Sequence, residues 1–100
     1  MSDYRLVSAP EADLEIEGAF EWYENEQTGL GREFLNELRR AYNRIVKGPL
    51  KYPIIRLNTR RARLKRFPYA VYFAAENEPV VVLAVLHTSR DPAEWQRRSR

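Results

Sequence analysis

Residues 61–86, RARLKRFPYAVYFAAENEPVVVLAVL, decide the fold. Charged and apolar residues alternate over residues 61–67, which predicts a strand with one polar and one apolar face. Residues 69–75 predict a second strand, and the unbroken apolar run over residues 80–86 is typical of a central strand buried on both faces. The segment therefore predicts a sheet that other elements must cover.

Two amphipathic helical patterns precede this segment. Apolar residues recur at helical spacing over residues 12–23 and again over residues 34–46. Ser8 with Glu11 has the spacing of a capping box, which predicts the start of the first helix. Residues 27–31 form a short connection, so the two helices are expected to pair as an antiparallel hairpin.

Weaker patterns complete the predicted fold. Residues 4–7 and 54–57 are short strand candidates, residues 91–95 predict one helical turn, and residues 96–100 are expected to fray as a basic tail. The order is therefore β-α-α-β-β-β-β with a short C-terminal helical turn. This is an α+β domain in which the N-terminal hairpin packs on one face of a small, mostly antiparallel sheet. Residues 1–100 have the length of a single domain.

The composition excludes several classes of protein. The chain has no cysteine and one histidine, which excludes disulfides, thiol chemistry and multi-histidine metal sites, so we expect no metal and no cofactor. No apolar stretch approaches the ~20 residues that cross a bilayer. Residues 1–5 do not resemble the start of a signal peptide. We therefore expect a cytoplasmic protein.

The net charge of +3 conceals a strong asymmetry along the chain. Residues 1–37 carry ten acidic and two basic residues, whereas residues 38–100 carry fifteen basic and four acidic ones. This division predicts an acidic helical part and a basic part that meets an anionic partner, such as a nucleic acid or an acidic protein. The alternative is two solvated faces without a partner.

The densest basic cluster lies on the predicted strand over residues 61–67. Its outward cations alternate with Ala62 and Leu64, so they are expected on the face of the sheet opposite the helices. Cations with aromatic neighbours suit phosphates, bases or acidic side chains. The alternative is an edge strand that its charges protect from aggregation. The expected target-binding residues are Arg61, Arg63, Lys65, Arg66, Tyr69, Tyr72, Arg90 and Trp95.

His87 ends the apolar run, at the point where the last strand leaves the core. A general base fits this position, because histidine exchanges protons near neutral pH. The alternative is a structural histidine bonded to a loop carbonyl. Ser89 and Asp91 follow at once, but no nucleophile turn is present, so we do not expect a catalytic triad.

Two stretches of the chain resemble the RelE/ParE toxins of bacterial type II toxin–antitoxin modules. They are Arg66-Phe67-Pro68-Tyr69 and His87-x-x-Arg90-Asp91-Pro92-x-x-Trp95. The resemblance covers residues 12–95 and implies the same α+β fold. It also implies an antitoxin partner, encoded beside the toxin, whose flexible acidic or amphipathic tail wraps the toxin in a hetero-oligomer.

The resemblance leaves two toxic activities open. RelE-type toxins are ribosome-dependent endonucleases that cut mRNA, and their pattern of basic residues is matched by Arg61, Arg63 and Arg90. If this chain is such an enzyme, His87 and Arg90 are its catalytic residues.

ParE-like toxins are poisons of DNA gyrase, which need a binding surface and no acid–base pair. Ala70 stands where the nuclease pattern has a cation, and Trp95 stands near its expected tyrosine. An indole does not transfer protons at neutral pH, so the sequence is closer to the ParE-like branch. A non-toxic RNA-binding module is a third possibility.

Overall fold

A computed structural model describes residues 3–100. Met1 and Ser2 lie outside the described residues. They belong to residues 1–5, from which we predict that no signal peptide is present. In chain order the elements are β1 (Leu6–Ser8), α1 (Pro10–Glu26), α2 (Leu30–Lys47), the 3₁₀ turn η1 (Pro49–Lys51), β2 (Ile54–Arg56), β3 (Thr59–Arg63), β4 (Tyr69–Ala74), β5 (Val80–His87) and α3 (Ala93–Gln96). This order confirms the predicted α+β arrangement.

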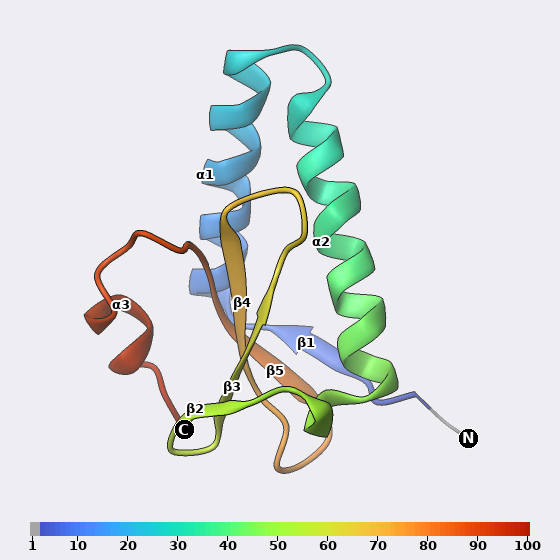
Figure 1. Ribbon diagram of the computed structural model, residues 1–100, viewed down its shortest axis with the longest axis vertical. Coiled ribbons are helices and arrows are strands. Elements are labelled where there is room, and N and C mark those ends of the chain that lie inside the picture. Colours follow the sequence, from blue (N-terminus) through green and yellow to red (C-terminus); the bar gives the residue numbers. More distant parts are fainter. Residues whose placement is uncertain (1–2) are drawn as a thin grey trace.

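The strands form one sheet in the order β1-β5-β4-β3-β2 (Figure 1). β1 runs parallel to β5, and the other neighbouring strands are antiparallel. The sheet is therefore mostly antiparallel, as predicted. β5 lies between two strands, and from Val80 to Leu86 every residue except Val81 is buried. The apolar run is thus a central strand that is covered on both faces.

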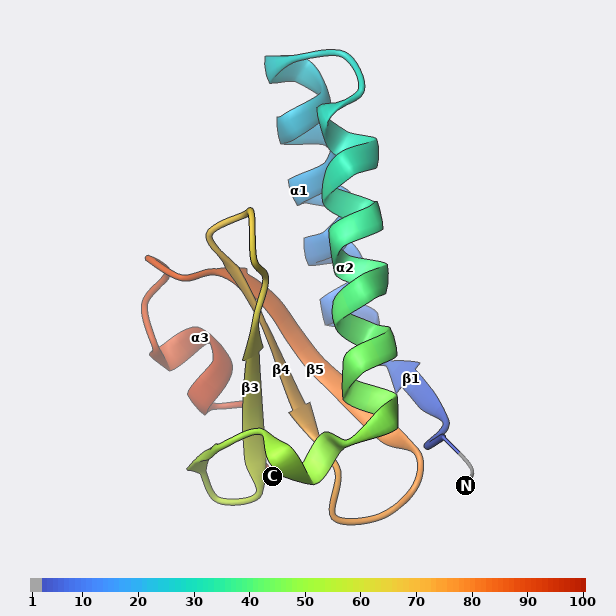
Figure 2. The ribbon, with the colours of Figure 1, turned by 45° about the vertical axis from the view of Figure 1, so that its right-hand side comes forward.

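The predicted helical hairpin covers one face of the sheet, and its tip reaches beyond the strands (Figures 1 and 2). Phe34 of α2 is completely buried at the centre of this interface. Its ring lies 5.5 Å from the ring of Tyr23, 5.5 Å from that of Phe67 and 5.1 Å from that of Tyr69, measured between centroids. This aromatic cluster joins both helices to the sheet.

The connection between the helices is held by a side chain of α1. The carboxylate of Glu24 accepts hydrogen bonds from the backbone N–H groups of Gly29 and Gly31, both at 3.0 Å. A carboxylate at a helix N-terminus satisfies N–H groups that otherwise lack partners, and its charge interacts favourably with the helix dipole. Glu24 therefore caps α2, which begins at Leu30, earlier than its apolar stripe alone indicates.

The predicted capping box at the start of α1 is wrong. The helix begins at Pro10 with Ala9 as its N-cap, and no side chain caps it. Ser8 stays in β1, because the backbone N–H of Ala9 continues the parallel pairing by donating to the carbonyl of Val82 at 2.9 Å. The hydroxyl of Ser8 donates instead to Asp13 Oδ1 at 2.5 Å.

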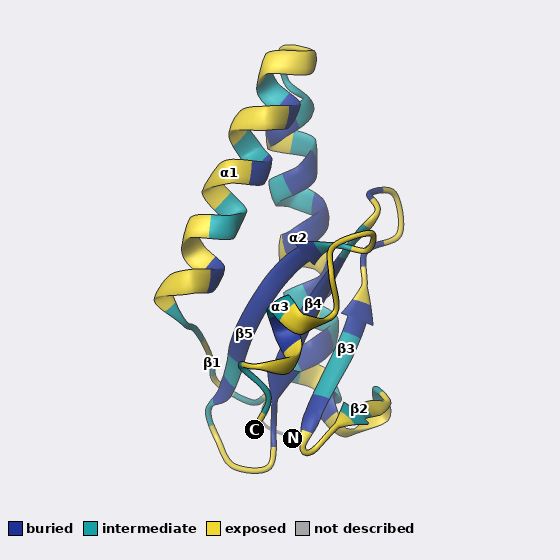
Figure 3. Cartoon of the chain, turned by 90° about the vertical axis from the view of Figure 1, so that its left-hand side faces the viewer, coloured by how far each residue is buried: buried dark blue, intermediate teal, exposed yellow. Residues whose placement is uncertain are grey.

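The face of the sheet opposite the hairpin carries a second, smaller apolar cluster beneath α3 (Figure 3). The predicted fraying of residues 96–100 is wrong. The backbone N–H of Arg100 donates to Thr59 Oγ1 at 3.0 Å, and the side chain of Arg98 is largely buried. The chain end therefore packs against the sheet. The buried residues of this cluster are Ala70, Tyr72, Ala84, Leu86 and Trp95.

The aromatic cluster predicts the cost of a core truncation. We expect Phe34→Ala to lower the free energy of unfolding by about 3–5 kcal/mol, because it leaves a cavity among three aromatic rings. Urea denaturation followed by circular dichroism measures this change. The control is Leu14→Ala, at an exposed leucine of α1, with an expected change within about 0.5 kcal/mol. Equal effects of the two substitutions would contradict the assigned core.

Candidate functional site

β3 places Arg61 and Arg63 on the face of the sheet opposite the hairpin. The strand register pairs Arg61 with Tyr72 and Arg63 with Ala70, and both partners belong to the cluster beneath α3. Arg63 is exposed and Arg61 is half-buried. Within residues 3–100, neither guanidinium takes part in an ion pair or a hydrogen bond. We call these two side chains the arginine face.

The other two cations of the basic segment lie beyond the end of β3, so strand alternation does not place them. Lys65 is exposed, and its backbone N–H donates to Glu37 Oε2 of α2 at 3.4 Å. Arg66 turns toward the hairpin, where its Nη2 lies 2.8 Å from Glu33 Oε1. Arg66, which is predicted to bind the target, therefore lies on the hairpin side of the sheet, apart from Arg61 and Arg63.

Tyr72 and Trp95 lie on the same face as the two arginines, but they are stacked on each other. Their ring centroids are 5.1 Å apart at an interplanar angle of 14°, and both side chains are buried. The indole of α3 thus occupies the surface on which a nucleic-acid base would stack. In this conformation, neither ring is exposed as a stacking partner for a base.

A β-bulge decides where the end of β5 points its side chains. Tyr72 pairs with Ala84 and Phe73 pairs with Val82, so Leu83 is an extra residue in β5. As a result Val82 and Val85 both face the hairpin core. The bulge shifts the alternation of every residue beyond it.

Tyr69 and His87 therefore lie on the hairpin side of the sheet, away from the arginine face. They are directly opposite each other in the register, with ring centroids 5.3 Å apart. Tyr69 packs against Phe34, and this burial raises the pKa of the Tyr69 hydroxyl, while the nearby positive charge of Arg90 lowers it to a smaller extent. The sheet thus separates the predicted histidine base from the cations of β3.

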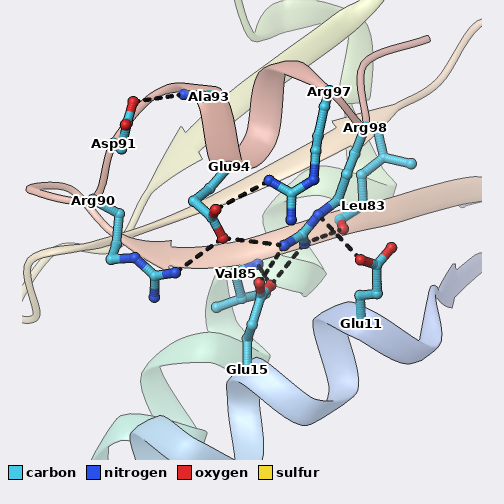
Figure 4. Close-up of polar contacts among 10 residues, drawn as sticks. All are labelled: Glu11, Glu15, Leu83, Val85, Arg90, Asp91, Ala93, Glu94, Arg97 and Arg98. Carbon is cyan, nitrogen blue, oxygen red and sulfur yellow. Dashed lines mark hydrogen bonds and ion pairs between the residues drawn. The ribbon is translucent and has the colours of Figure 1, made fainter.

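The imidazole of His87 is held by the turn that follows β5. Its Nδ1 accepts a hydrogen bond from the backbone N–H of Ser89 at 3.0 Å and lies 2.8 Å from the Ser89 hydroxyl. Because a backbone N–H only donates, a neutral imidazole here carries its proton on Nε2. Asp91 is used elsewhere, since its Oδ1 accepts from the backbone N–H of Ala93 at 3.0 Å (Figure 4). No Ser-His-Asp triad is formed, as the sequence predicts.

Arg98 joins the chain end to α1 and β5 (Figure 4). Its Nη2 lies 2.7 Å from Glu15 Oε2, and its Nη1 donates to the carbonyl of Leu83 at 3.1 Å. Glu15 Oε1 accepts from the backbone N–H of Val85 at 3.0 Å. β1 pairs with β5 only as far as Val82, so Glu15 and Arg98 satisfy the backbone groups of β5 beyond that point.

The Glu15–Arg98 pair is the main feature of this region that the sequence did not reveal. The two residues are 83 positions apart, so no local pattern connects them. The hydrogen bond that Arg98 donates to Glu15 raises the pKa of the Arg98 guanidinium, with burial acting in the opposite direction. The pair is therefore a structural ion pair.

Glu94 pairs with two further basic side chains around α3, those of Arg90 and Arg97 (Figure 4). Its two carboxylate oxygens lie 3.0 Å from Arg90 Nη2 and 3.0 Å from Arg97 Nη1. The hydrogen bond from Arg97 lowers the pKa of Glu94. Arg90, predicted to bind the target or to assist catalysis, is thus held by an acidic neighbour in this structure.

Within residues 3–100, no group of three histidine, aspartate or glutamate side chains is placed to hold a metal ion. The same part of the chain contains no helix that is both long and apolar enough to cross a membrane.

The sequence and the fold agree with one known family. Residues 6–92 match the family described as "ParE toxin of type II toxin-antitoxin system, parDE". The chain belongs to the ParE toxin family. This confirms the predicted RelE/ParE relationship and its ParE-like branch. No curated protein matches the sequence.

A solved structure has the same fold as this ParE-family chain. It is titled "Chromosomal ParDE TA system from P. aeruginosa" and superposes with a TM-score of 0.75. The match covers 84% of this chain and 95% of that chain, although the sequences are only 10% identical. At this identity the likeness concerns the fold alone.

The geometry of this ParE-family chain suits binding better than proton transfer. Arg61 and Arg63 are successive outward residues on one strand, which places their Cα atoms about 7 Å apart. Guanidinium groups form paired hydrogen bonds to carboxylates and phosphates. His87, by contrast, lies on the other side of the sheet. The arginine face can therefore hold two neighbouring anionic groups without a general base beside them.

The Glu15–Arg98 pair predicts a large difference between two adjacent arginines. We expect Arg98→Ala to lower the free energy of unfolding by about 1.5–3 kcal/mol, because it strips the charged partner from Glu15 and the donor from Leu83. Arg97→Ala is the matched control, since its pair with Glu94 is more exposed, and we expect a change of about 0–1 kcal/mol. Urea denaturation of both variants measures the difference. Two similar midpoints would show that Arg98 does not fasten the chain end.

Proposed function

We propose that this ParE-family toxin arrests bacterial growth in the cytoplasm by binding DNA gyrase through its arginine face. We also propose that an antitoxin encoded beside it keeps it inactive. The single observation that carries the first proposal is the separation of groups across the sheet. Arg61 and Arg63 are accessible on one side, and His87 is held on the other.

The family relationship supports an antitoxin partner for this chain. The matched family is described as part of a type II toxin–antitoxin system, and the similar P. aeruginosa structure is titled as a ParDE system. A toxin with exposed cations also suits a partner with acidic segments. The complex with this partner is the form in which we expect the protein to occur in the cell.

A second candidate function is cleavage of mRNA on the ribosome. Its support comes from one region: the hydrogen bond from Ser89 to His87 Nδ1 orients the imidazole, and Tyr69, His87 and Arg90 line the same cavity. These groups have the chemistry of a proton donor beside an electrostatic stabiliser. The geometry favours cleavage less than it favours binding, because Arg61 and Arg63 lie on the side of the sheet opposite His87.

The arginine face predicts a separation of toxicity from folding. We expect Arg61→Glu with Arg63→Glu to abolish growth arrest and to weaken gyrase binding by roughly 100-fold or more, because like charges in contact cost several kcal/mol. The free energy of unfolding is expected to change by only about 0.5 kcal/mol. Inducible expression without the neighbouring gene, a supercoiling assay with purified gyrase and a thermal melt measure these effects.

The control for that experiment is Lys47→Glu with Lys51→Glu, which reverses two exposed cations at the end of α2 and in η1. We expect it to leave supercoiling inhibition unchanged. If the unmodified protein at micromolar concentration leaves the supercoiling activity of gyrase unchanged, the gyrase proposal is refuted. If cells in which the protein accumulates grow normally, the protein is not toxic. This result would favour a non-toxic RNA-binding module.

The nuclease candidate is tested by primer extension on mRNA from translating ribosomes. If the chain is an enzyme, His87→Ala abolishes the cuts and the protein still folds. If the chain acts on gyrase, no cuts appear and His87→Ala remains toxic. The two candidates thus give opposite results with the same variant.

A further inference from the structure

Two adjoining cavities lie on the hairpin side of the sheet, where α1 passes the end of β5. Their volumes are about 270 Å³ and 440 Å³, and both are lined by Trp22, Tyr69 and His87. The larger volume falls within the range of about 300–1,000 Å³ that is usual for small-molecule pockets. We call the two cavities together the Trp22 cleft. Its lining also includes Glu15 and Arg90.

One face of α1 forms a wall of the Trp22 cleft. The α1 residues in the lining are three, one and three positions apart, which places them on one side of the helix. They are Glu15, Gly18, Ala19 and Trp22. Outside its own turn of helix, a Cβ atom on Gly18 would lie within 4 Å of nothing in residues 3–100. Packing therefore does not require this glycine, although glycine weakens a helix relative to alanine, and its lack of a side chain leaves the cleft open.

The indole of Trp22 is unusually accessible for a tryptophan, since 58% of the residue is exposed. Its ring meets Tyr23 edge to face, with centroids 5.1 Å apart and an interplanar angle of 85°. Trp95 differs, because it is buried and stacked on Tyr72. Among residues 3–100, no aromatic ring is stacked on Trp22 in this way. A planar ring from outside the chain therefore has a surface on which to stack.

The sheet forms the other wall of the Trp22 cleft with Tyr69 and His87, whose ring centroids are 5.3 Å apart. The Nδ1 atom of His87 is occupied, because it accepts from the backbone N–H of Ser89. Its Nε2 is then the ring nitrogen that donates when the imidazole is neutral. This wall thus offers two more rings and a hydrogen-bond donor.

The charge of the lining favours an anion. Arg90 Nη2 lies 3.0 Å from Glu94, but Glu94 also pairs with Arg97 at 3.0 Å, so two guanidinium groups share one carboxylate (Figure 4). The acidic lining residue, Glu15, is paired with the largely buried Arg98 at 2.7 Å. Of the two charged lining residues, Arg90 therefore keeps more unpaired charge than Glu15.

We propose that the Trp22 cleft binds a nucleoside phosphate, with its base stacked on Trp22 and its phosphate at Arg90. Stacking on an aromatic side chain suits every base, because every base has a flat face. Guanidinium groups form paired hydrogen bonds to phosphates. This inference goes beyond the proposed function, because the arginine face lies on the other side of the sheet.

Two other occupants fit the Trp22 cleft less well. A cationic ligand needs an acidic partner, and the carboxylate of Glu15 is already paired with Arg98. An apolar protein segment would cover Arg90 and the Nε2–H group of His87 without supplying an acceptor, and covering unpaired polar groups weakens binding. A nucleoside phosphate presents a flat ring to the aromatic residues and an anion to the arginine.

An NMR titration of the full chain tests the site, because its two tryptophans report on opposite sides of the sheet. We expect AMP and GMP at millimolar concentration to shift the indole N–H signal of Trp22 and to leave that of Trp95 in place. Adenosine and ribose 5-phosphate are expected to bind roughly fivefold more weakly than AMP or worse, since each lacks one of the two contacts. The signal that disappears in Trp22→Ala identifies Trp22.

Substitutions separate the two contacts, with Kd measured by isothermal titration calorimetry. We expect Trp22→Ala to raise the Kd for AMP about tenfold, the effect of losing one base stack. Arg90→Gln is expected to raise the Kd for AMP by about the same factor and to leave that for adenosine unchanged. Leu14→Ala, at an exposed leucine of α1, and Arg97→Gln, at the other arginine paired with Glu94, are the matched controls and leave both values unchanged.

Gly18→Leu tests the cleft sterically and leaves both contact residues in place. Leucine favours a helix more than glycine does, so we expect the chain to fold and to lose AMP binding. Thermal melts identify any variant that fails to fold. The proposal is overturned if AMP and GMP leave the Trp22 signal in place, if folded Trp22→Ala binds AMP as tightly as Leu14→Ala does, or if folded Gly18→Leu binds AMP normally.

A 5′-phosphorylated RNA tetranucleotide distinguishes the two sources of such a ligand. If it binds roughly tenfold more tightly than AMP or better, the site takes a nucleotide of an RNA strand, because neighbouring nucleotides then add contacts. Equal or weaker binding assigns the site to free nucleotides. Both results support a nucleoside phosphate as the bound group.

The proposed function fails in a different way. We expect Trp22→Ala to leave the inhibition of gyrase unchanged, since Arg61 and Arg63 are intact on the other side of the sheet. If nucleotides do not bind and gyrase is still inhibited, this inference alone is wrong. If nucleotides bind and the chain neither inhibits gyrase nor arrests growth, the proposed function is wrong and the nucleotide site stands.

Discussion

The structure depends on the burial of one strand on both of its faces. Because β5 is apolar from Val80 to Leu86, it needs a cover on each side. The hairpin supplies the first cover, and α3 supplies the second (Figures 2 and 3). Beyond the end of β1, Glu15 and Arg98 also satisfy the free edge of the strand. Arg98 at the chain end therefore stabilises the fold, because it donates to a backbone carbonyl of β5 that no strand partner satisfies.

The parts of the fold that local geometry determines were predictable from the sequence. Alternation alone placed Arg61 and Arg63 opposite the hairpin, because side chains on a strand point to alternate faces. The remaining features depend on contacts between distant residues. Trp95 covers Tyr72 only once α3 has docked, and the face of His87 depends on a bulge. Propensity and periodicity carry no information about either event.

The asymmetric charge of the sequence is only partly available to partners. Several opposite charges meet within the chain, including Glu33 with Arg66, and the pair formed by Glu15 and Arg98 is largely buried. Arg61 and Arg63 of the arginine face are outside this internal pairing. Net charge therefore predicts an anionic partner, and the cations without internal partners mark the surface on which we expect it to bind.

The extra residue in β5 has a consequence for how such a sheet acquires new chemistry. Regular alternation from Val80 would bring His87 out beside the guanidinium groups of β3, whereas the bulge at Leu83 sends it to the other side. One inserted residue thus decides whether an imidazole and two cations work as neighbours. Evolution can move a proton-transfer group through such a layer by changing strand length by one residue, with the group itself left intact.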